Sequence, residues 1–249
     1  MIVLIESVQG KITLDVSFAG WMGASQSNWK SQTYDIRFTS KEGLSVILPQ
    51  VSGELVLPIG SVEFVKKACE ILDIELPKPL NIPTSLESGL GRRIWSCKRS
   101  EINSIWYPFF VKPEVELKLF TGFVANSEAD FELYPELNGW NGSLLCSEPL
   151  GYIESEWRCY ILGGKVLNCS CYNGDALCFP DRNKIEDLIA GYKDAPTGYA
   201  LDVAVTGDGT QLIECNDAWA LGYYGGEFEQ YFKMVRTRWM EILRAQKVV

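Results

Sequence analysis

Two carboxylates on neighbouring β-like segments are the side chains of this 249-residue sequence best placed for chemistry. The segments Tyr199–Thr206 and Thr210–Asn216 flank a glycine-rich turn, a pattern that predicts a β-hairpin. Asp202 lies on the first segment, and Glu214 precedes Asn216 on the second. Two carboxylates and an amide oxygen form an all-oxygen set that suits Mg²⁺ or Mn²⁺. Taken alone, however, the pattern favours a solvated hairpin face with two screened acids.

The register of the hairpin decides whether the two acids meet. A two-residue Asp208-Gly209 turn would pair Val203 with Glu214 and place a carboxylate among apolar side chains. A three-residue loop over residues 207–209 would make Asp202 and Glu214 direct cross-strand partners. Its other pairs are Val203 with Ile213 and Leu201 with Cys215. We prefer this second register because it separates the apolar face from the polar face, and a cation would then relieve the repulsion between the opposed acids.

Two basic side chains in strand-like segments suit phosphate binding. Lys112 follows the apolar run 109–111 and precedes Pro113. A lysine is a point charge on a flexible stem, which suits a phosphate ligand, although an exposed lysine before a loop has the same pattern. Arg158 follows Glu156 by two residues, and its planar fork of donors suits a phosphoryl group. The alternative for Arg158 is an ion pair with Glu156 on an exposed strand face, which adds little stability.

The order of these motifs resembles that of the ATP-grasp superfamily. Asp202, together with the Glu214-Cys215-Asn216 run, is similar to the Asp and the Glu-x-Asn that hold Mg²⁺ against the phosphates of ATP in that superfamily. Lys112 resembles the strand-end lysine that contacts adenine and the α-phosphate there. Arg158 and Glu156 resemble the acidic–x–Arg strand of the subgroup that includes the ribosomal-protein glutamate ligases. The match is closest to a subgroup found in phages and bacteria.

The resemblance spans about residues 60–225 and implies a role for particular side chains. The implied metal ligands are Asp202, Glu214 and Asn216, and the implied nucleotide and catalytic residues are Lys112, Lys118, Glu148, Glu156 and Arg158. Glu148 follows the strand-like run Ser143–Ser147 at the place of the ribose-binding acid. The flap region 114–120 lacks the glycines of the superfamily, so Lys118 would supply charge to the phosphates. The upstream basic residue of the nucleotide site is left open among four candidates: Lys66, Lys67, Arg92 and Arg93.

The same resemblance implies an ATP-dependent ligase that uses ATP and Mg²⁺ or Mn²⁺. Such an enzyme activates a carboxylate as an acyl phosphate and joins it to an amine or a similar nucleophile. The expected partners are a small-molecule, peptide or protein carboxylate and an amine, whose identity the sequence leaves open, as it does the oligomeric state. The missing flap glycines motivate a second hypothesis, a catalytically reduced ATP-binding protein with a regulatory or interaction role.

Composition excludes several other classes of function. The chain has no histidine, which rules out Ser-His-Asp and Cys-His catalysis and histidine-ligated zinc. A net charge of −9 argues against binding to a nucleic-acid backbone. No apolar run approaches the length of a membrane span, and the first residues lack the pattern of a signal peptide. Eight cysteines without a CxxC motif indicate reduced, buried thiols, and we therefore expect a cytoplasmic protein.

The elements that must position these residues follow from periodicity and turn chemistry. Strands are predicted at Met1–Glu6, Lys11–Phe18, Thr33–Phe38, Leu44–Leu48, Glu54–Leu57, Phe109–Val111, Leu117–Val124, Ser143–Ser147, Glu156–Leu162 and Lys165–Tyr172, besides the acidic hairpin. Helices are predicted from Ser61, as N-cap, to Leu72, and over Lys184–Tyr192 and Glu227–Ala245.

The expected fold class is α+β, with an ATP-grasp fold that holds a nucleotide between two subdomains. Prolines at 77, 79 and 83 suggest a boundary, which gives a small α/β pre-ATP-grasp-like domain over residues 1–80 and a nucleotide-binding and catalytic domain over 81–249. The aromatic and glycine-rich segment Trp219–Gly226 follows the metal motif. A turn that packs on the C-terminal helix is preferred there over a substrate wall.

Overall fold

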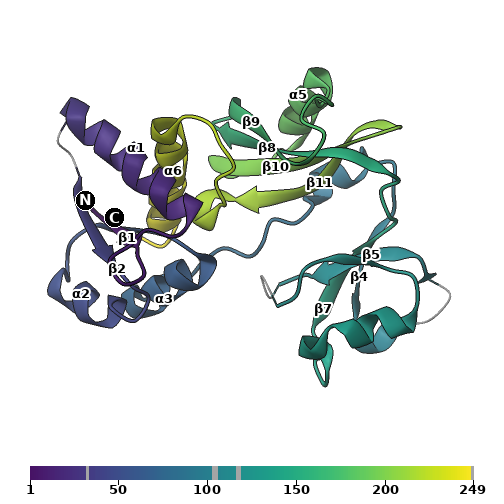
Figure 1. Cartoon of the computed structure of the whole chain (residues 1–249), viewed down its shortest axis with the longest axis horizontal. Helices are drawn as coiled ribbons and strands as arrows, with labels where there is room; N and C mark the ends of the chain where they lie inside the picture. The colour runs from purple at the N-terminus through teal and green to yellow at the C-terminus, as the bar shows by residue number, and fades with distance from the viewer. Residues whose placement is uncertain (32–33, 103–105, 116–118, 248–249) are drawn as a thin grey trace.

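The computed structural model describes residues 1–31, 34–102, 106–115 and 119–247. Its fold is built on three sheets (Figure 1). The first sheet is parallel, with strand order β2-β1-β3. Its strands are β1 (Ile2–Glu6), β2 (Asp35–Thr39) and β3 (Val56–Ile59), and its helices are α1 (Asp15–Ser31), α2 (Leu44–Gln50) and α3 (Val62–Leu72). Residues 2–5 of the central strand are buried, as expected for a parallel strand covered on both faces.

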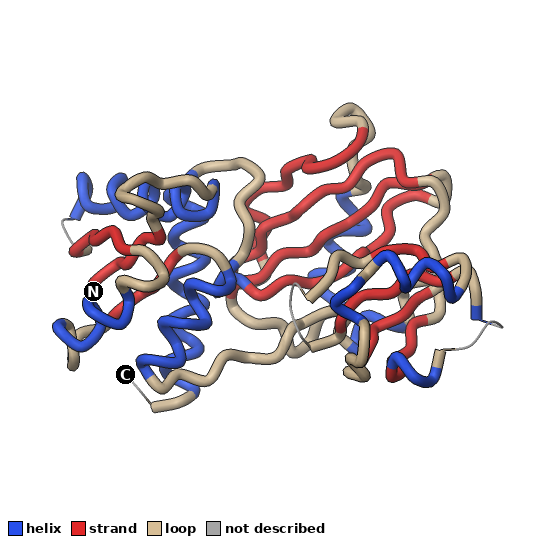
Figure 2. Tube along the Cα trace, turned by 60° about the horizontal axis from the view of Figure 1, so that its bottom comes forward, coloured by secondary structure: helices blue, strands red, loops and turns tan. Residues whose placement is uncertain are grey.

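The second and third sheets are antiparallel, and their strands are among the red segments in Figure 2. The small sheet has the order β4-β7-β5-β6, with β4 (Ile94–Lys98), β5 (Phe109–Pro113), β6 (Phe123–Ala125) and β7 (Ser143–Ser147). The long sheet has the order β11-β10-β8-β9, with β8 (Ile153–Leu162), β9 (Lys165–Gly174), β10 (Gly198–Thr206) and β11 (Gly209–Asp217). The other helices are α4 (Thr84–Glu87), α5 (Arg182–Gly191) and α6 (Phe228–Ala245), with short 3₁₀ turns at Arg99–Glu101, Glu128–Leu133, Pro135–Leu137 and Ala218–Ala220.

Two predicted strands are not strands in the structure. The second half of the run Lys11–Phe18 lies in α1, which begins at Asp15, and Leu44–Leu48 lies in α2. In α2 the two buried leucines, Leu44 and Leu48, are four residues apart, which is helical spacing that β-branched neighbours obscured. The predicted strand Leu117–Val124 lies partly outside the described residues, and its described part contains β6 only from Phe123.

Helix α1 has a weak sequence signal because tertiary packing, and not local propensity, stabilises it. It lies beside α6 (Figure 1). A Cβ atom at Gly23 would lie 2.3 Å from the carbonyl oxygen of Phe228 and 2.5 Å from the Cβ of Phe232. The absence of a side chain at Gly23 therefore lets the two helices approach closely, at some cost in helix propensity.

The start of α3 agrees with the prediction. The Oγ of Ser61 accepts a hydrogen bond from the backbone N–H of Phe64 at 3.2 Å, which is the N-cap interaction expected there. Its buried residues include Phe64, Val65 and Ala68, which pack against the parallel sheet. Among the described helices, none is both long and apolar enough to cross a membrane.

The C-terminal helix α6 joins distant parts of the chain. Trp239 is fully buried, and its Nε1–H donates to the carbonyl oxygen of Val56 on β3 at 2.7 Å. Arg238 forms two hydrogen bonds with Asp217 at the end of β11, from Nε at 2.8 Å and from Nη2 at 2.7 Å. One core therefore includes both the parallel sheet and α6. The division of the chain near residue 80 stays a prediction.

Replacing Trp239 by alanine should lower the free energy of unfolding by about 3–5 kcal/mol, because it leaves a cavity and an unpaired buried carbonyl. Trp29 is 80% exposed, so Trp29→Ala is a matched control that should stay within about 0.5 kcal/mol of wild type. Chemical denaturation of both variants checks this, and equal losses would contradict the role of Trp239.

Replacing Arg238 by methionine should destabilise the fold by about 3–5 kcal/mol at pH 7, because Asp217 is left buried without its partner. Burial already raises the pKa of Asp217, and without Arg238 the folded carboxyl binds its proton more tightly still. A raised folded-state pKa adds stability at low pH that is lost as the pH rises. The loss relative to wild type should therefore shrink between pH 7 and pH 5 in urea unfolding.

The matched control for this variant is Arg182→Met. Arg182 pairs with Glu186 on the surface of α5, and its side chain is 87% exposed. An exposed i,i+4 pair contributes only about 0.3–0.5 kcal/mol. A pH-independent loss in Arg238→Met would show that the buried charge of Asp217 is not its cause.

Candidate active site

The two acids of the hairpin are direct neighbours in the structure. Asp202 on β10 lies opposite Glu214 on β11, and Leu201 lies opposite Cys215, both as predicted. The loop is shorter than predicted, because Thr206 pairs with Gly209. A bulge next to Asp202 then absorbs one residue, so that Val203 pairs with Leu212 and the predicted pair of Val203 with Ile213 is wrong. The bulge places apolar side chains opposite each other on one side of it and the acids opposite each other on the other side.

Asp202 is held by Arg158, which lies opposite it on the adjacent strand β8. The Nε of Arg158 donates to Oδ1 of Asp202 at 2.8 Å, and its Nη2 donates to Oδ2 at 2.6 Å. Both side chains are buried, with 9% and 4% of their surfaces exposed. Burial raises the pKa of Asp202 while the guanidinium opposes that rise. Burial alone would lower the pKa of Arg158, but the bonds to Asp202 outweigh it and raise that pKa.

Glu214 is held by Lys112, which comes from the small sheet. The Nζ of Lys112 at the end of β5 contacts Oε2 of Glu214, so this ion pair connects the two antiparallel sheets. Burial would raise the pKa of Glu214, but Lys112 and Asn216 lower it, so the carboxylate stays ionised. The Nδ2 of Asn216 donates to Oε1 of Glu214 at 2.9 Å and to Oδ2 of Asp202 at 3.0 Å. Five predicted site residues thus form one hydrogen-bonded group, which we call the cluster: Lys112, Arg158, Asp202, Glu214 and Asn216.

The cluster fits a hard divalent cation in its chemistry. Among the described residues no group of three or more His, Cys, Asp or Glu side chains could hold a metal. The cluster instead offers two carboxylates and one amide, Asp202, Glu214 and Asn216, with the amide within 3.0 Å of both acids. A half-turn of the Asn216 amide group would present its oxygen in place of its nitrogen. That set resembles the oxygen ligands that Mg²⁺ takes together with phosphates and water.

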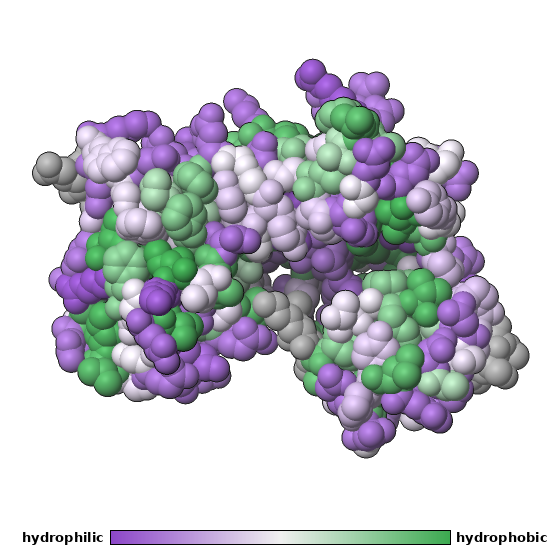
Figure 3. Space-filling view, in the orientation of Figure 1, coloured by the Kyte–Doolittle hydropathy of each residue, from purple (hydrophilic) through white to green (hydrophobic). Residues whose placement is uncertain are grey.

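Two pockets meet at this cluster. The apolar pocket, about 480 Å³, lies between the small sheet and the hairpin, and its apolar side chains include Ile82, Ile94, Phe110, Val124 and Leu145. The mixed pocket, about 790 Å³, is lined among others by Ser61, Asn81, Phe120, Tyr134, Trp219 and Tyr224. Lys112 and Glu214 line both. The surface is hollowed between the small sheet and the rest of the molecule (Figure 3).

The other predicted site residues are not all at these pockets. Glu156 lines the apolar pocket, and its carboxylate accepts hydrogen bonds from Tyr172 at 3.0 Å and Asn173 at 2.7 Å. Glu148 follows β7, but its side chain is half exposed, accepts the backbone N–H of Arg93 at 2.9 Å, and lines neither pocket. Lys118 lies outside the described residues.

Of the four upstream basic candidates, Arg92 is the one that lines the apolar pocket. Its Nη2 donates to the carbonyl oxygen of Leu212 at 2.6 Å, while its Nε and Nη1 are buried without a hydrogen-bond partner among the described residues. Burial lowers the pKa of Arg92. Arg93 lies mostly in solvent over the ring of Trp95. No sequence pattern separates Arg92 from Arg93, because burial of one neighbour and not the other is a tertiary property.

The segment Trp219–Gly226 both packs on α6 and lines the mixed pocket. Tyr231 of α6 donates its hydroxyl hydrogen to the carbonyl oxygen of Leu221. The expected packing on α6 is therefore confirmed, and Trp219, Gly222 and Tyr224 also lie on the wall of the mixed pocket. Sequence reasoning did not predict the contact between Tyr224 of this segment and Arg158, whose Cζ lies 4.7 Å from the centroid of the tyrosine ring.

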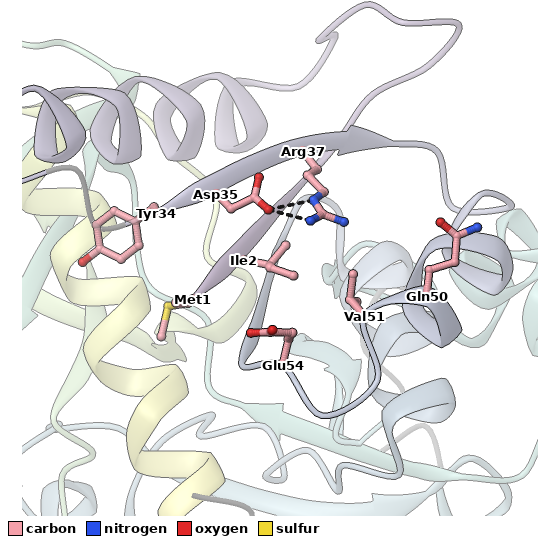
Figure 4. Close-up of a pocket in the computed structure, with 8 residues that line it drawn as sticks. All are labelled: Met1, Ile2, Tyr34, Asp35, Arg37, Gln50, Val51 and Glu54. Atoms are coloured by element: carbon pink, nitrogen blue, oxygen red, sulfur yellow. Dashed lines mark hydrogen bonds and ion pairs between the residues drawn. The ribbon is translucent and has the colours of Figure 1, made fainter.

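A third hollow lies at the other end of the parallel sheet (Figure 4). It is lined by Met1, Ile2, Tyr34, Asp35, Arg37, Gln50, Val51 and Glu54. Arg37 donates to Asp35 from Nη2 at 2.6 Å, and both side chains come from β2. Ligands of parallel sheets usually bind at the carboxyl ends of the strands, whereas this hollow lies at their amino ends. It is therefore a weaker candidate than the cluster.

Solved structures with similar folds were found by comparison. The chain is similar to D-alanine–D-alanine ligase from Bacillus anthracis complexed with ATP, with 14% identity, a TM-score of 0.58 and coverage of 99% of this chain and 98% of that one. The chain is also similar to a RimK domain ATP-grasp protein from Sphaerobacter thermophilus, with 13% identity, a TM-score of 0.57 and coverage of 94% of this chain and 98% of that one. For N5-carboxyaminoimidazole ribonucleotide synthetase from Thermotoga maritima, the identity is 12%, the TM-score is 0.54, and the coverage is 94% of this chain and 75% of that one. At such identities the similarity shows the fold.

Comparison with curated proteins gives no match. A family model described as an ATP-grasp domain of the R-2-K clade, family 2, matches residues 90–234, which include the small sheet, the long sheet and the cluster. The predicted resemblance and the α+β ATP-grasp fold are confirmed, and family membership supports an ATP-dependent carboxylate–amine ligase. The chain belongs to family 2 of the R-2-K clade of ATP-grasp domains.

Proposed function

We propose that this protein is an ATP-dependent ligase that activates a carboxylate as an acyl phosphate and joins it to an amine or a similar nucleophile. The observation that carries the proposal is the cluster of Lys112, Glu214, Asn216, Asp202 and Arg158 at the junction of two pockets. The names of similar solved structures, which include a ligase and a synthetase, agree with it. The substrates would be small-molecule, peptide or protein carboxylates and amines.

The two pockets divide the reaction between them. The apolar pocket has the size and lining for a purine, and Lys112 at its junction with the mixed pocket would contact the phosphates. Asp202, Glu214 and Asn216 would hold Mg²⁺ or Mn²⁺, which when bound supplies positive charge to the phosphates. The acid and the amine would then bind in the mixed pocket, whose wall includes Arg158.

The chemistry requires positioning and charge neutralisation more than a proton-transfer group with a tuned pKa. A carboxylate oxygen attacks the γ-phosphorus, the bond to the β–γ bridging oxygen breaks, and ADP leaves. The amine then attacks the acyl carbon, inorganic phosphate leaves, and the ammonium proton is lost to water. Arg158 has two N–H groups beyond the three that bond to Asp202 and Gly222, and these would stabilise the phosphoryl group in transfer.

The proposed location of the protein is the cytoplasm. All eight cysteines are free, in keeping with the cytoplasmic location that the sequence predicts.

Substrate-stimulated release of ADP from Mg·ATP, measured with pooled amino acids and short peptides, tests the ligase. Tight binding of Mg·ATP without any stimulated ADP release would favour the catalytically reduced regulator instead.

Glu214→Ala should abolish metal-dependent ATP turnover, because it removes a metal ligand and leaves Lys112 without its carboxylate. Turnover should fall at least about 100-fold in an ADP-release assay, as for other groups that stabilise transferred charge. Glu132→Ala is the control, since Glu132 is exposed and lies outside both pockets. A cooperative melt must show that Glu214→Ala is folded, and unchanged turnover in the folded variant would contradict the proposed site.

Arg92→Met should weaken binding of Mg·ATP about tenfold or more, whereas Arg93→Met should change it less than about twofold. The reason is that Arg92 lines the apolar pocket with unpartnered donors, while Arg93 lies mostly in solvent. Thermal shift and titration calorimetry measure both, because a ligand that binds the folded state stabilises it by mass action. Equal losses in the two variants would show that the choice between them is wrong.

A further inference from the structure

Arg158 is held by a second group besides Asp202. The strap, residues 221–226, follows the metal motif and crosses the long sheet beside Arg158. The Nη1 of Arg158 donates to the carbonyl oxygen of Gly222 in the strap at 3.3 Å. The Cζ of Arg158 also lies 4.7 Å from the ring centroid of Tyr224. A guanidinium over an aromatic ring is attracted by the negative face of the ring, and more strongly where water is excluded.

The Tyr224 ring is itself fixed from two sides. It stacks on Tyr172 of β9 with centroids 4.9 Å apart and planes inclined by 28°. The backbone N–H of Tyr224 donates to the hydroxyl oxygen of Tyr160 at 2.8 Å, and that hydroxyl donates to the carbonyl oxygen of Gly222 at 3.2 Å. Burial raises the pKa of Tyr160 to about 12, so the hydroxyl keeps its proton at neutral pH.

Glycines allow the strap to lie this close to the sheet. Gly225 and Gly226 have φ values of 137° and 106°, which residues with side chains rarely adopt. A Cβ atom at Gly226 would lie 2.7 Å from the Nδ2 of Asn168 on β9. The same nitrogen donates to the carbonyl oxygen of Gly225 at 3.2 Å. The path of the strap is therefore determined at both of its ends.

The bonds from the strap matter because Asp202 has two functions to serve. If Asp202 contributes oxygen to a cation, the electron density of its carboxylate is shared between that cation and Arg158, and the grip on Arg158 weakens. The carbonyl of Gly222 and the ring of Tyr224 are not part of the metal set. They keep the guanidinium plane in place whatever Asp202 binds.

We propose that Tyr224 is a positioning residue that orients Arg158 toward the transferred phosphoryl group, and that the strap is its anchor independent of Asp202. The proposal rests on the proposed function, since it assigns Arg158 to the phosphoryl group. Gly222 and Tyr224 also form part of the wall of the mixed pocket. The strap would therefore contact both Arg158 and the substrate that binds in that pocket. Tyr224 acts through Arg158 and takes no part in bond making.

The experiment compares Tyr224→Leu with Tyr224→Phe, which keeps the ring. Titration calorimetry measures binding of Mg·ADP alone and of Mg·ADP with aluminium fluoride, a mimic of the phosphoryl group in transfer. Tyr224→Leu should weaken binding of the mimic about tenfold and that of Mg·ADP less than about twofold. Tyr224→Phe should restore binding of the mimic to within about threefold of wild type. Where turnover is seen, Tyr224→Leu should lower kcat in parallel with its weaker binding of the mimic, while KM for ATP should not change.

A double-mutant cycle shows whether the ring acts through Arg158. Tyr224→Leu should cost little further binding of the mimic in an Arg158→Lys background, because lysine lacks the planar group that the ring holds. Equal losses in both backgrounds would overturn the positioning role. Tyr160→Phe, which frees the strap but keeps both partners, should lower binding of the mimic in the same direction as Tyr224→Leu.

The outcomes separate this proposal from the ligase assignment. Wild-type protein that binds neither Mg·ADP nor the mimic would contradict the proposed function, and the positioning role with it. Wild-type protein that binds the mimic, with Tyr224→Leu binding it as tightly, would contradict the positioning role alone. Tyr224 is half exposed, so its replacement should leave the melting temperature nearly unchanged.

Discussion

The repulsion between Asp202 and Glu214 is the constraint on which the rest of the site depends. Two carboxylates that face each other across adjacent strands are unstable unless positive charge reaches both. One base, Arg158, comes from the neighbouring strand of the same sheet, and the other, Lys112, comes from a different sheet. The long sheet and the small sheet must therefore approach each other at Glu214. The apolar pocket lies beside this contact, between the small sheet and the hairpin, while residues 60–62 and 79–81 also line the mixed pocket.

The energetics of these pairs suggest why they are present. A buried ion pair adds little stability compared with a well-packed apolar pair, since desolvation offsets most of the attraction. Removing one partner, however, leaves a buried charge unpaired and lowers the free energy of unfolding. The cluster is better explained by what it can bind than by what it adds to the fold. Under the proposed function, a cation and the phosphates of ATP would bring complementary charges that replace internal contacts of the cluster.

The helix α6 gives the site its frame. Trp239 connects it to the parallel sheet, and Arg238 connects it to Asp217, next to the cluster residue Asn216. The strap is the link between that end of β11 and the start of α6, so its course over β8 and β9 follows from where these two elements are anchored. Strand β3 thereby supports the helix that frames the site, through a hydrogen bond between residues 183 positions apart. Similar folds at 12–14% identity show that the overall fold tolerates wide changes in sequence.

The sequence by itself determined the local features. Period-two patterns located the hairpin strands, Ser61 marked the start of α3, and the spacing of Asp202, Glu214 and Asn216 matched the superfamily that the family model identifies. Only the tertiary structure decided the rest. Helix α1 forms because of its packing on α6, the bulge beside Asp202 restores the pairing of the acids, and Arg92 differs from Arg93 by burial alone. These outcomes depend on contacts between residues far apart in the chain, and local pattern carries no information about such contacts.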